Sequence, residues 1–323
     1  MKLSIVSTLY CSAPHVDEFH QRASATAERL AGDDYEIVLV NDGSPDDSLE
    51  RATRIADKDK HVVVIDLSRN FGHHKAMMTG LRYSSGDLVF LIDSDLEEAP
   101  EWLISFQQQL DIEGGDVVYG VQTKRKGNFF ERWSGGLFYR AFRFLSGLDL
   151  PYNITVARLM TRRYVRALVL HREYELFMAG LWIITGFDQS PHAVTKISSS
   201  QTTYSLRKKV AQLVDSIASF SNKPLIGIFV LGCGIFAISS SYTAFVIVNW
   251  LFLSRPPTGY TSLIASVWLL GGMIIAFIGV VGIYLSKIYS ETKQRPYTII
   301  RQIHGRSQRS LAANEEDHHL WRV

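Results

Sequence analysis

Two long stretches in the second half of the chain, residues 224–254 and 256–286, contain no charged side chain. A helix that crosses a lipid bilayer needs about 20 consecutive, mainly apolar residues. Each stretch is long enough to span a bilayer and leaves room for tilt. The pattern therefore predicts transmembrane helices over residues 224–254 and 257–286, joined as a hairpin. Two long helices buried in a protein core are the alternative interpretation.

Basic residues flank these two stretches on their outer sides, whereas the short loop between them contains only Arg255. Lysine and arginine favour the cytoplasmic side of a membrane. We therefore expect an integral membrane protein with both ends in the cytoplasm, including a basic tail over residues 287–323. The flanking residues are Arg207, Lys208, Lys209 and Lys223 before the first stretch, and Lys287, Lys293, Arg295, Arg301, Arg306 and Arg309 after the second.

The segment before the first stretch, residues 206–223, carries apolar residues three and four positions apart, beginning with Val210, Leu213 and Val214. Three basic residues precede them. This pattern predicts an amphipathic helix that lies on the membrane surface. An ordinary helix packed against the N-terminal domain is the alternative.

Apolar runs alternate with helix-length polar segments through the first half of the chain. Such alternation predicts a parallel sheet with right-handed crossovers. We assign residues 1–205 to one α/β domain on this basis. The expected strands are residues 3–8, 35–40, 62–67, 88–92 and 117–120, and the expected helices are residues 15–31, 47–60 and 75–83.

Two carboxylates, Asp93 and Asp95, directly follow the apolar run 88–92. Ligands of open α/β sheets bind at the carboxyl ends of the strands. Hard divalent cations prefer oxygen ligands, which they often share with substrate phosphates. The spacing therefore indicates a cation site, and an acidic turn is the alternative.

The remaining composition excludes several kinds of site. The chain has only two cysteines, Cys11 and Cys233, and the second lies in an uncharged stretch. We therefore expect neither a disulfide nor a cysteine metal site, and the ten histidines show no zinc spacing. The formal net charge is only +2, and no nucleic-acid partner is expected.

Three segments that follow expected strands carry a resemblance to a known family. They are residues 41–44 (Asn-Asp-Gly-Ser), 67–74 (Leu-Ser-Arg-Asn-Phe-Gly-His-His) and 93–96 (Asp-Ser-Asp-Leu). Together with the two uncharged stretches, they resemble the family-2 glycosyltransferases, and more narrowly the polyprenyl-phosphate glycosyltransferases. The resemblance covers most of the chain, roughly residues 1–300. It implies a GT-A fold, which is a nucleotide-binding α/β domain with a mostly parallel sheet.

The resemblance also implies a reaction. Such enzymes transfer a single sugar, with inversion, from a nucleotide-sugar to a polyprenyl phosphate at the cytoplasmic face of the membrane. We expect a UDP-sugar donor, undecaprenyl phosphate or a similar lipid as acceptor, and Mg²⁺ or Mn²⁺ as cofactor. The expected setting is the inner membrane of a bacterium, where the product serves cell-envelope glycan synthesis or modification. A homo-oligomer is also expected.

On the donor side, the resemblance assigns Asp42, Ser44, Arg69 and Asp93 to nucleotide-sugar binding. Asp95 would hold the metal directly, together with Asp93, and both aspartates are expected to be catalytic. The cation would act as a Lewis acid that neutralises charge on the leaving nucleoside diphosphate.

On the acceptor side, the resemblance assigns Arg125, Arg132 and Arg158 to the phosphate of the lipid. A guanidinium group matches the geometry of a phosphate through two parallel hydrogen bonds. Arg125 is also expected to contribute to catalysis. A solvated basic loop is the alternative for the segment that holds Arg125 and Arg132.

The main departure from the family pattern lies at Val156 and Ala157, where the family usually has Asp-Phe. That aspartate is a candidate catalytic base, and its loss need not remove activity. A phosphate monoester has a second pKa of about 6, so it is already mostly ionised at neutral pH. Positioning and electrostatics could then supply most of the rate. Glu173 or Glu175 is the alternative base, and Thr203 stands where a family lysine is usual.

Two other functions remain open. A non-catalytic membrane scaffold derived from such a transferase would account for the missing base and lysine, although the retained Asp93 and Asp95 favour an enzyme. A processive polysaccharide synthase usually carries a Gln-x-x-Arg-Trp motif. Here Phe129 takes the place of the glutamine before Arg132 and Trp133, and only two spanning segments are expected.

Overall fold

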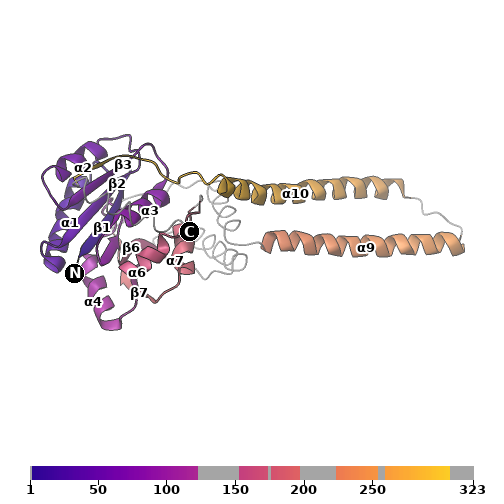
Figure 1. Ribbon diagram of the computed structural model, residues 1–323. Coiled ribbons are helices and arrows are strands. Elements are labelled where there is room, and N and C mark those ends of the chain that lie inside the picture. The colour runs from indigo at the N-terminus through magenta and orange to yellow at the C-terminus, as the bar shows by residue number, and fades with distance from the viewer. Residues whose placement is uncertain (1, 123–152, 174–175, 197–222, 254–258, 306–323) are drawn as a thin grey trace. The chain divides into compact units, whose positions relative to one another are not determined.

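The computed structural model describes residues 2–122, 153–173, 176–196, 223–253 and 259–305 (Figure 1). The chain forms two compact units. The first contains residues 1–132 and 150–203 together with the C-terminal segment from residue 295 onward. The second contains residues 133–149 and 204–294.

The described residues of the first unit form one sheet of eight strands. The strands are β1 (Leu3–Leu9), β2 (Tyr35–Asn41), β3 (Val62–Leu67), β4 (Leu88–Leu91), β5 (Val117–Gln122), β6 (Ile154–Thr161), β7 (Gln189–Val194) and β8 (Ile300–His304).

The order across the sheet is β7-β5-β6-β4-β1-β2-β3-β8. The central strand β1 pairs in parallel with β2 and β4, and the pairs β2–β3 and β5–β7 are also parallel. Strand β6 runs antiparallel to β4 and β5, and β8 runs antiparallel to β3. The predicted α/β fold with a mostly parallel sheet is therefore confirmed.

The helices of this unit gather around the sheet (Figure 1). They are α1 (Val16–Ala31), α2 (Ser48–Ala56), α3 (His73–Tyr83), α4 (Trp102–Glu113), α6 (Arg162–Leu168) and α7 (Met178–Ile184).

One face of the central strands packs against α1, α2 and α4. Ile5 and Phe90 from the sheet share a buried core with Phe19 of α1 and Phe106 of α4. The rings of Phe90 and Phe106 meet edge to face at 6.0 Å. Burial of this face explains why the side chains on one side of these strands are apolar.

The other face is covered by α3. Gly80 of α3 lies so close to the sheet that a Cβ atom there would sit 2.9 Å from a methyl group of Val40 and also crowd Val6. Because both faces are covered, every residue of β1 and β2 is buried. This double burial is the physical reason that the first strands read as continuous apolar runs in the sequence.

The strands and helices expected within residues 1–205 are confirmed in position, with ends that shift by a few residues. Helices α4, α6 and α7 and strands β6 and β7 were not predicted. Strand β7 lies at the edge of the sheet and contains Pro191 and His192, a composition that does not suggest a strand from sequence alone.

Part of the segment assigned to the basic tail belongs to the sheet. Strand β8 lies after the second uncharged stretch and pairs with β3. The next residue, Gly305, has a φ of +82°, and a side chain there would collide with the backbone oxygen of Val62. The chain therefore returns to the first unit and completes its edge.

The second unit contains α9 (Lys223–Leu253) and α10 (Tyr260–Thr292), which contact each other. The two uncharged stretches are thus helical, and α10 continues past residue 286. In the part of the chain that the structure describes, one stretch, Leu270–Thr292, is long and apolar enough to cross a membrane by length and composition. The amphipathic helix expected over 206–223 lies outside the described residues, apart from Lys223 at the start of α9.

Candidate active site

The candidate residues of the donor side collect at one edge of the sheet. Strands β1, β2 and β4 are neighbours and run parallel, so their carboxyl ends lie side by side. Asp42 follows β2, and Asp93 and Asp95 follow β4. The loop between β3 and α3 joins the same edge. Ligands of open α/β sheets bind at such an edge.

Asp42 is buried and holds the loop after β3 in place. Its carboxylate accepts hydrogen bonds from the backbone N–H groups of Phe71 (2.7 Å) and Gly72 (3.0 Å). The adjacent Gly43 has a φ of +60°, and a side chain at that position would collide with the backbone of Asn70. Burial raises the pKa of the Asp42 carboxyl, and the two N–H groups partly offset that effect.

Ser44 links the loops after β1 and β2. Its hydroxyl donates to Asp46 at 2.5 Å and accepts a hydrogen bond from the backbone N–H of Cys11 at 2.8 Å. Cys11 has a φ of 55°, which is unusual for a residue with a side chain.

Arg69 is exposed at the rim of this edge. Its guanidinium lies 4.1 Å from the centre of the Phe71 ring and donates to the backbone oxygen of Asn70 at 2.9 Å. The structure therefore places Asp42, Ser44 and Arg69 on neighbouring loops, as their assignment to one donor site requires.

His73 joins three segments of the site. Its Nδ1 lies 3.0 Å from the Thr8 hydroxyl at the end of β1, and its Nε2 lies 3.2 Å from Asp93 Oδ1. Burial opposes a charge on the imidazole, but the carboxylates of Asp93, Asp42 and Asp95 outweigh it and raise the pKa of His73. The sequence identified this histidine only as part of the loop after β3.

The turn that carries Asp93 and Asp95 is anchored from within. The buried Ser94 hydroxyl donates to the backbone oxygen of Thr8 at 2.8 Å. Leu96 has a φ of 61°, a conformation that costs energy for a residue with a side chain and is often found at functional sites. The turn is therefore held in a fixed and locally strained shape.

Within this turn, Asp93 is half-buried and Asp95 is exposed. Oδ1 of Asp95 accepts a hydrogen bond from the backbone N–H of Glu97 at 3.0 Å. The protein packed around Asp95, together with the charges of Asp93 and Glu97, raises the pKa of its carboxyl group. A cation would relieve this accumulation of negative charge.

The two aspartates fit a cation that shares its ligands with a substrate. Among the described residues, no group of three or more His, Cys, Asp and Glu side chains is suited to hold a metal ion by itself. Mg²⁺ is commonly bound by one or two carboxylates and completes its coordination with water and substrate phosphates. Asp93 and Asp95 supply such a partial set of oxygen ligands.

A buried ion pair that the sequence did not reveal lies next to this turn. Lys196 Nζ is 2.7 Å from Glu98 Oε1, and Glu98 is fully buried. The Glu98 carboxylate also accepts hydrogen bonds from the N–H groups of Val156 (3.1 Å) and Ala157 (2.7 Å). In the sequence, Glu98 looks like its neighbour Glu97, and no local pattern links it to a lysine so far along the chain.

Arg158 lies inside the first unit, with an exposed fraction of 1%. Its guanidinium lies over the Trp182 ring and donates to the backbone oxygens of Val156 (3.2 Å) and Thr155 (3.3 Å). Burial lowers the pKa of Arg158 to about 9. This position does not support its assignment to the acceptor phosphate, and Arg158 instead holds the backbone of β6.

The remaining acceptor residues, Arg125 and Arg132, lie outside the described residues, as does Glu175. Glu173, the other alternative base, lies 3.9 Å from His171 Nδ1.

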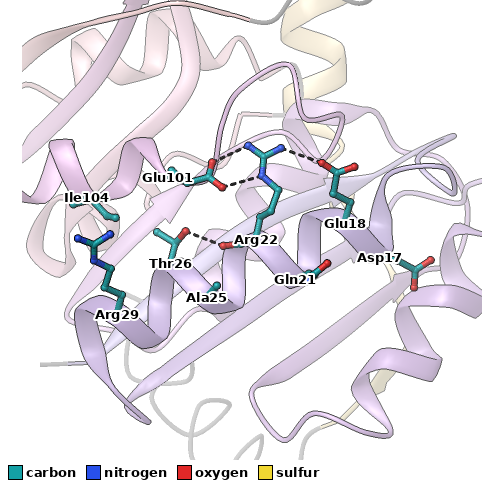
Figure 2. A pocket seen from close by; sticks show the side chains of 9 residues that line it. All are labelled: Asp17, Glu18, Gln21, Arg22, Ala25, Thr26, Arg29, Glu101 and Ile104. Carbon is teal, nitrogen blue, oxygen red and sulfur yellow. Dashed lines mark hydrogen bonds and ion pairs between the residues drawn. The ribbon is translucent and has the colours of Figure 1, made fainter.

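A surface pocket of about 870 Å³ lies along α1 and α4 (Figure 2). Arg22 spans it, donating to Glu101 at 2.8 and 2.9 Å and to Glu18 at 3.2 Å. None of the candidate site residues lines this pocket. Figure 2 shows Arg22 paired with Glu18 and Glu101, and we assign this pocket no role in the reaction.

This chain is similar to several known proteins. The family model described as Glycosyl transferase family 2 matches residues 4–169. A Mycobacterium tuberculosis protein whose name assigns it to the glycosyltransferases is 53% identical over 305 residues, which cover 94% of this chain and 89% of that protein. A bactoprenol glucosyl transferase from Shigella phage SfII is 31% identical over 307 residues, 94% of this chain and 99% of that protein. A crystal structure of S. aureus TarS with UDP-GlcNAc has a TM-score of 0.46 and 16% identity over 68% of this chain and 66% of that one.

Proposed function

The chain belongs to glycosyl transferase family 2, and we propose that it transfers one sugar, with inversion, from a UDP-sugar to a polyprenyl phosphate such as undecaprenyl phosphate. The observation that carries this proposal is the grouping of Asp42, Asp93 and Asp95 at one edge of a GT-A-like sheet, in a chain that continues into two long helices. Binding of a nucleotide-sugar requires such a group of aspartates, and the two long helices suit a lipid-linked acceptor.

The donor would lie across the carboxyl ends of β1, β2 and β4. Asp42 fixes the loop after β3, and Ser44 fixes the loop after β1, so the nucleotide meets a surface that is already formed. Arg69, which is exposed at the rim, would meet the phosphates. Asp93 is held by His73 and Asp95 is exposed, so both can face the diphosphate.

Asp95 and Asp93 would hold Mg²⁺ or Mn²⁺. The bound cation would neutralise charge on the leaving nucleoside diphosphate. In the reaction, an oxygen of the acceptor phosphate forms a bond to the anomeric carbon of the sugar. The bond from that carbon to the diphosphate oxygen breaks on the opposite side, which inverts the configuration.

In this proposal, the acceptor phosphate attacks the sugar without a base from the protein. It is mostly dianionic at neutral pH because its second pKa is about 6. The Val156 position therefore needs no carboxylate base. Arg125 and Arg132 are proposed to hold the phosphate. The name of the phage relative, bactoprenol glucosyl transferase, supports a lipid acceptor.

We also propose that α9 and α10 span the membrane as a hairpin, with both ends in the cytoplasm of a bacterium and residues 206–223 on the membrane surface. The position of β8 supports an even number of crossings. The chain before α9 and the chain after α10 contribute strands to one sheet, so both must lie on the same side of a membrane. The basic residues on the outer sides of the two helices support the cytoplasmic side.

A panel of radiolabelled nucleotide-sugars tests the proposal. The purified full-length protein is incubated in detergent with undecaprenyl phosphate and each donor in turn. We expect organic-phase label with a UDP-sugar, and no label when the lipid phosphate is omitted. A folded protein that binds UDP yet labels no lipid with any donor would contradict the proposal and favour a non-catalytic scaffold.

A further inference from the structure

The ion pair between Glu98 and Lys196 connects the loop after β4 with the residues after β7. Glu98 has no exposed surface. Burial and the nearby charge of Asp93 raise the pKa of Glu98, whereas its three donors favour the ionised form. Those donors are the Lys196 ammonium and the N–H groups of Val156 and Ala157. A buried carboxylate needs such partners because it has lost its water.

The two backbone groups that Glu98 binds belong to Val156 and Ala157, where the resemblance to the family led us to expect an aspartate. No carboxylate is present in the side chains of Val156 and Ala157. The structure instead brings the Glu98 carboxylate to their backbone from another loop. Because Glu98 is enclosed, it cannot touch a substrate itself. Its partner Lys196 is different, since 21% of that side chain is exposed.

Lys196 lies beside the turn of the proposed cation site, because its partner Glu98 follows Asp95 by three residues. Burial opposes the charge of the ammonium, but the carboxylates of Glu98, Asp93 and Asp95 outweigh it and raise the pKa of Lys196. The lysine therefore stays charged at neutral pH. An ammonium has three hydrogen-bond donors, and the contact with Glu98 needs only one.

The reaction brings further negative charge to this edge. The donor carries a diphosphate, and the acceptor carries a phosphate that is mostly dianionic. Both must approach a turn that already holds Asp93 and Asp95. A fixed positive charge beside that turn reduces the repulsion and acts most strongly where water is excluded.

We propose that Lys196 donates a hydrogen bond to a phosphoryl oxygen of the donor diphosphate or of the acceptor phosphate, and that Glu98 is the positioning residue that fixes the ammonium. This inference rests on the proposed function, because it concerns the same reaction. Lys196 would thus contact a substrate, although the sequence alone did not mark it as a candidate.

Four variants of the full-length protein separate substrate binding from a purely structural ion pair. They are Lys196→Met, Lys196→Arg, Glu98→Gln, and Glu98→Gln combined with Lys196→Met. Lys196→Met alone leaves Glu98 buried without its counterion, so it can lower stability for that reason only. The double variant removes both charges and avoids this problem. Its Tm is measured first to establish that it folds.

We expect Lys196→Met and the double variant to lose transfer activity by roughly 10- to 100-fold, as removal of a hydrogen bond to a charged group does. Lys196→Arg keeps the charge and should lose less than either. Glu98→Gln should lower activity less than the double variant, because the lysine remains present but is less firmly held.

Two further measurements on the double variant identify the phosphate. A weaker affinity for UDP indicates the donor diphosphate. A higher KM for undecaprenyl phosphate with unchanged UDP affinity indicates the acceptor phosphate. Either result supports the proposal. Transfer at the wild-type rate by the double variant, with both constants unchanged, would overturn it and leave the pair a structural element only.

Failure of the proposed function has a different signature, because the wild-type protein would then produce no lipid product from any donor. The affinity for UDP still tests Lys196 in that case. Weaker UDP binding by the double variant would support the contact with a diphosphate, and equal affinities would overturn it.

Discussion

The three aspartates at the candidate site occupy different surroundings. Asp42 is buried, and both of its oxygens accept hydrogen bonds from the backbone. Asp93 is half-buried and lies against His73. Asp95 is exposed. The carboxylate with the greatest access to a cation and to a diphosphate is therefore Asp95, while Asp42 mainly shapes the site.

Asp95→Asn should abolish transfer while the fold remains intact. An amide is neutral and a poorer ligand for a hard cation. The loss of one such electrostatic partner costs about a hundredfold or more in rate. Initial rates of lipid labelling measure the effect, and the Tm should not change because the side chain is exposed. Asp57→Asn, at an exposed aspartate after α2, is the matched control. Equal rates for Asp95→Asn and the control would show that the metal assignment is wrong.

Asp46 accepts a hydrogen bond from Ser44 of the donor site, and the pKa of its carboxyl group is lowered. Burial opposes its ionisation, but hydrogen bonds from Ser44, Ser48 and Ala13 outweigh that effect and lower the pKa of Asp46 from 3.8 to about 2. Such a shift corresponds to at most about 2 kcal/mol of stability, and screening by solvent reduces this value. Because the pKa in the folded state is below that in the unfolded state, this contribution is present above the unfolded pKa. It is lost as the pH falls through about 2.

Asp46→Asn should therefore lower stability at pH 7 by about 1–2 kcal/mol. Its difference from the wild type should shrink as the pH falls from about 4 towards 2. Thermal unfolding in detergent over a pH series measures this. Asp47→Asn, at the exposed neighbouring aspartate, is the control. A stability difference that stays constant down to the lowest pH would mean that the charge of Asp46 is not the cause.

The positions of the three aspartates could be predicted from the sequence because the signal is local. Asp42 directly follows β2, and Asp93 and Asp95 lie in the turn after β4. The pair of Glu98 and Lys196 could not be predicted, since its members come from distant loops that meet only in the folded sheet. The burial of Arg158 likewise depends on the place of β6 between β4 and β5, which no local pattern revealed.

At the scale of elements, β8 links the end of the chain to the donor site. Arg301 of β8 lies 3.2 Å from Asp66 Oδ2 and donates to the Ser68 backbone oxygen at 2.6 Å. The other oxygen of Asp66 accepts a hydrogen bond from Asn41 at 2.8 Å. The chain after α10 therefore supports both the end of β2 and the start of the loop after β3. The short strand was missed in the sequence because it lies in a basic segment and pairs only at the edge.

Arg301→Ala should weaken UDP binding by roughly 3- to 10-fold, because the loop that carries Arg69 loses a support worth about 1 kcal/mol. Calorimetric titration of UDP measures the change. Gln302→Ala, at an exposed residue of the same strand, should bind UDP as the wild type does. If the two variants bind UDP equally well, β8 closes the sheet without supporting the donor loops.

At the scale of the whole molecule, one sheet contains strands from before and after the two long helices. For the proposed membrane hairpin, this connection restricts the topology more strongly than the charge pattern does. Any arrangement that puts the C-terminal segment across the membrane from the first unit would break the pairing of β8 with β3. The sequence predicted the two helices and an orientation for them. The structure added β8, through which the chain after α10 returns to the sheet of the first unit.

Reporter fusions test that topology. A phosphatase that is active only outside the cytoplasm should be inactive at the C-terminus and active when inserted in the loop over residues 255–259. A fluorescent protein that folds only in the cytoplasm should give the opposite pattern. An active phosphatase at the C-terminus would contradict the hairpin.

The mass of the lipid product tests the central claim most directly. The wild-type protein in liposomes is given undecaprenyl phosphate and the UDP-sugar that labels lipid, and the extracted lipid is analysed by mass spectrometry. We predict a polyprenyl phosphate that has gained a single sugar, formed by the wild type and not by Asp95→Asn. Free sugar and UDP with unmodified lipid, or a lipid carrying a chain of sugars, would contradict the account.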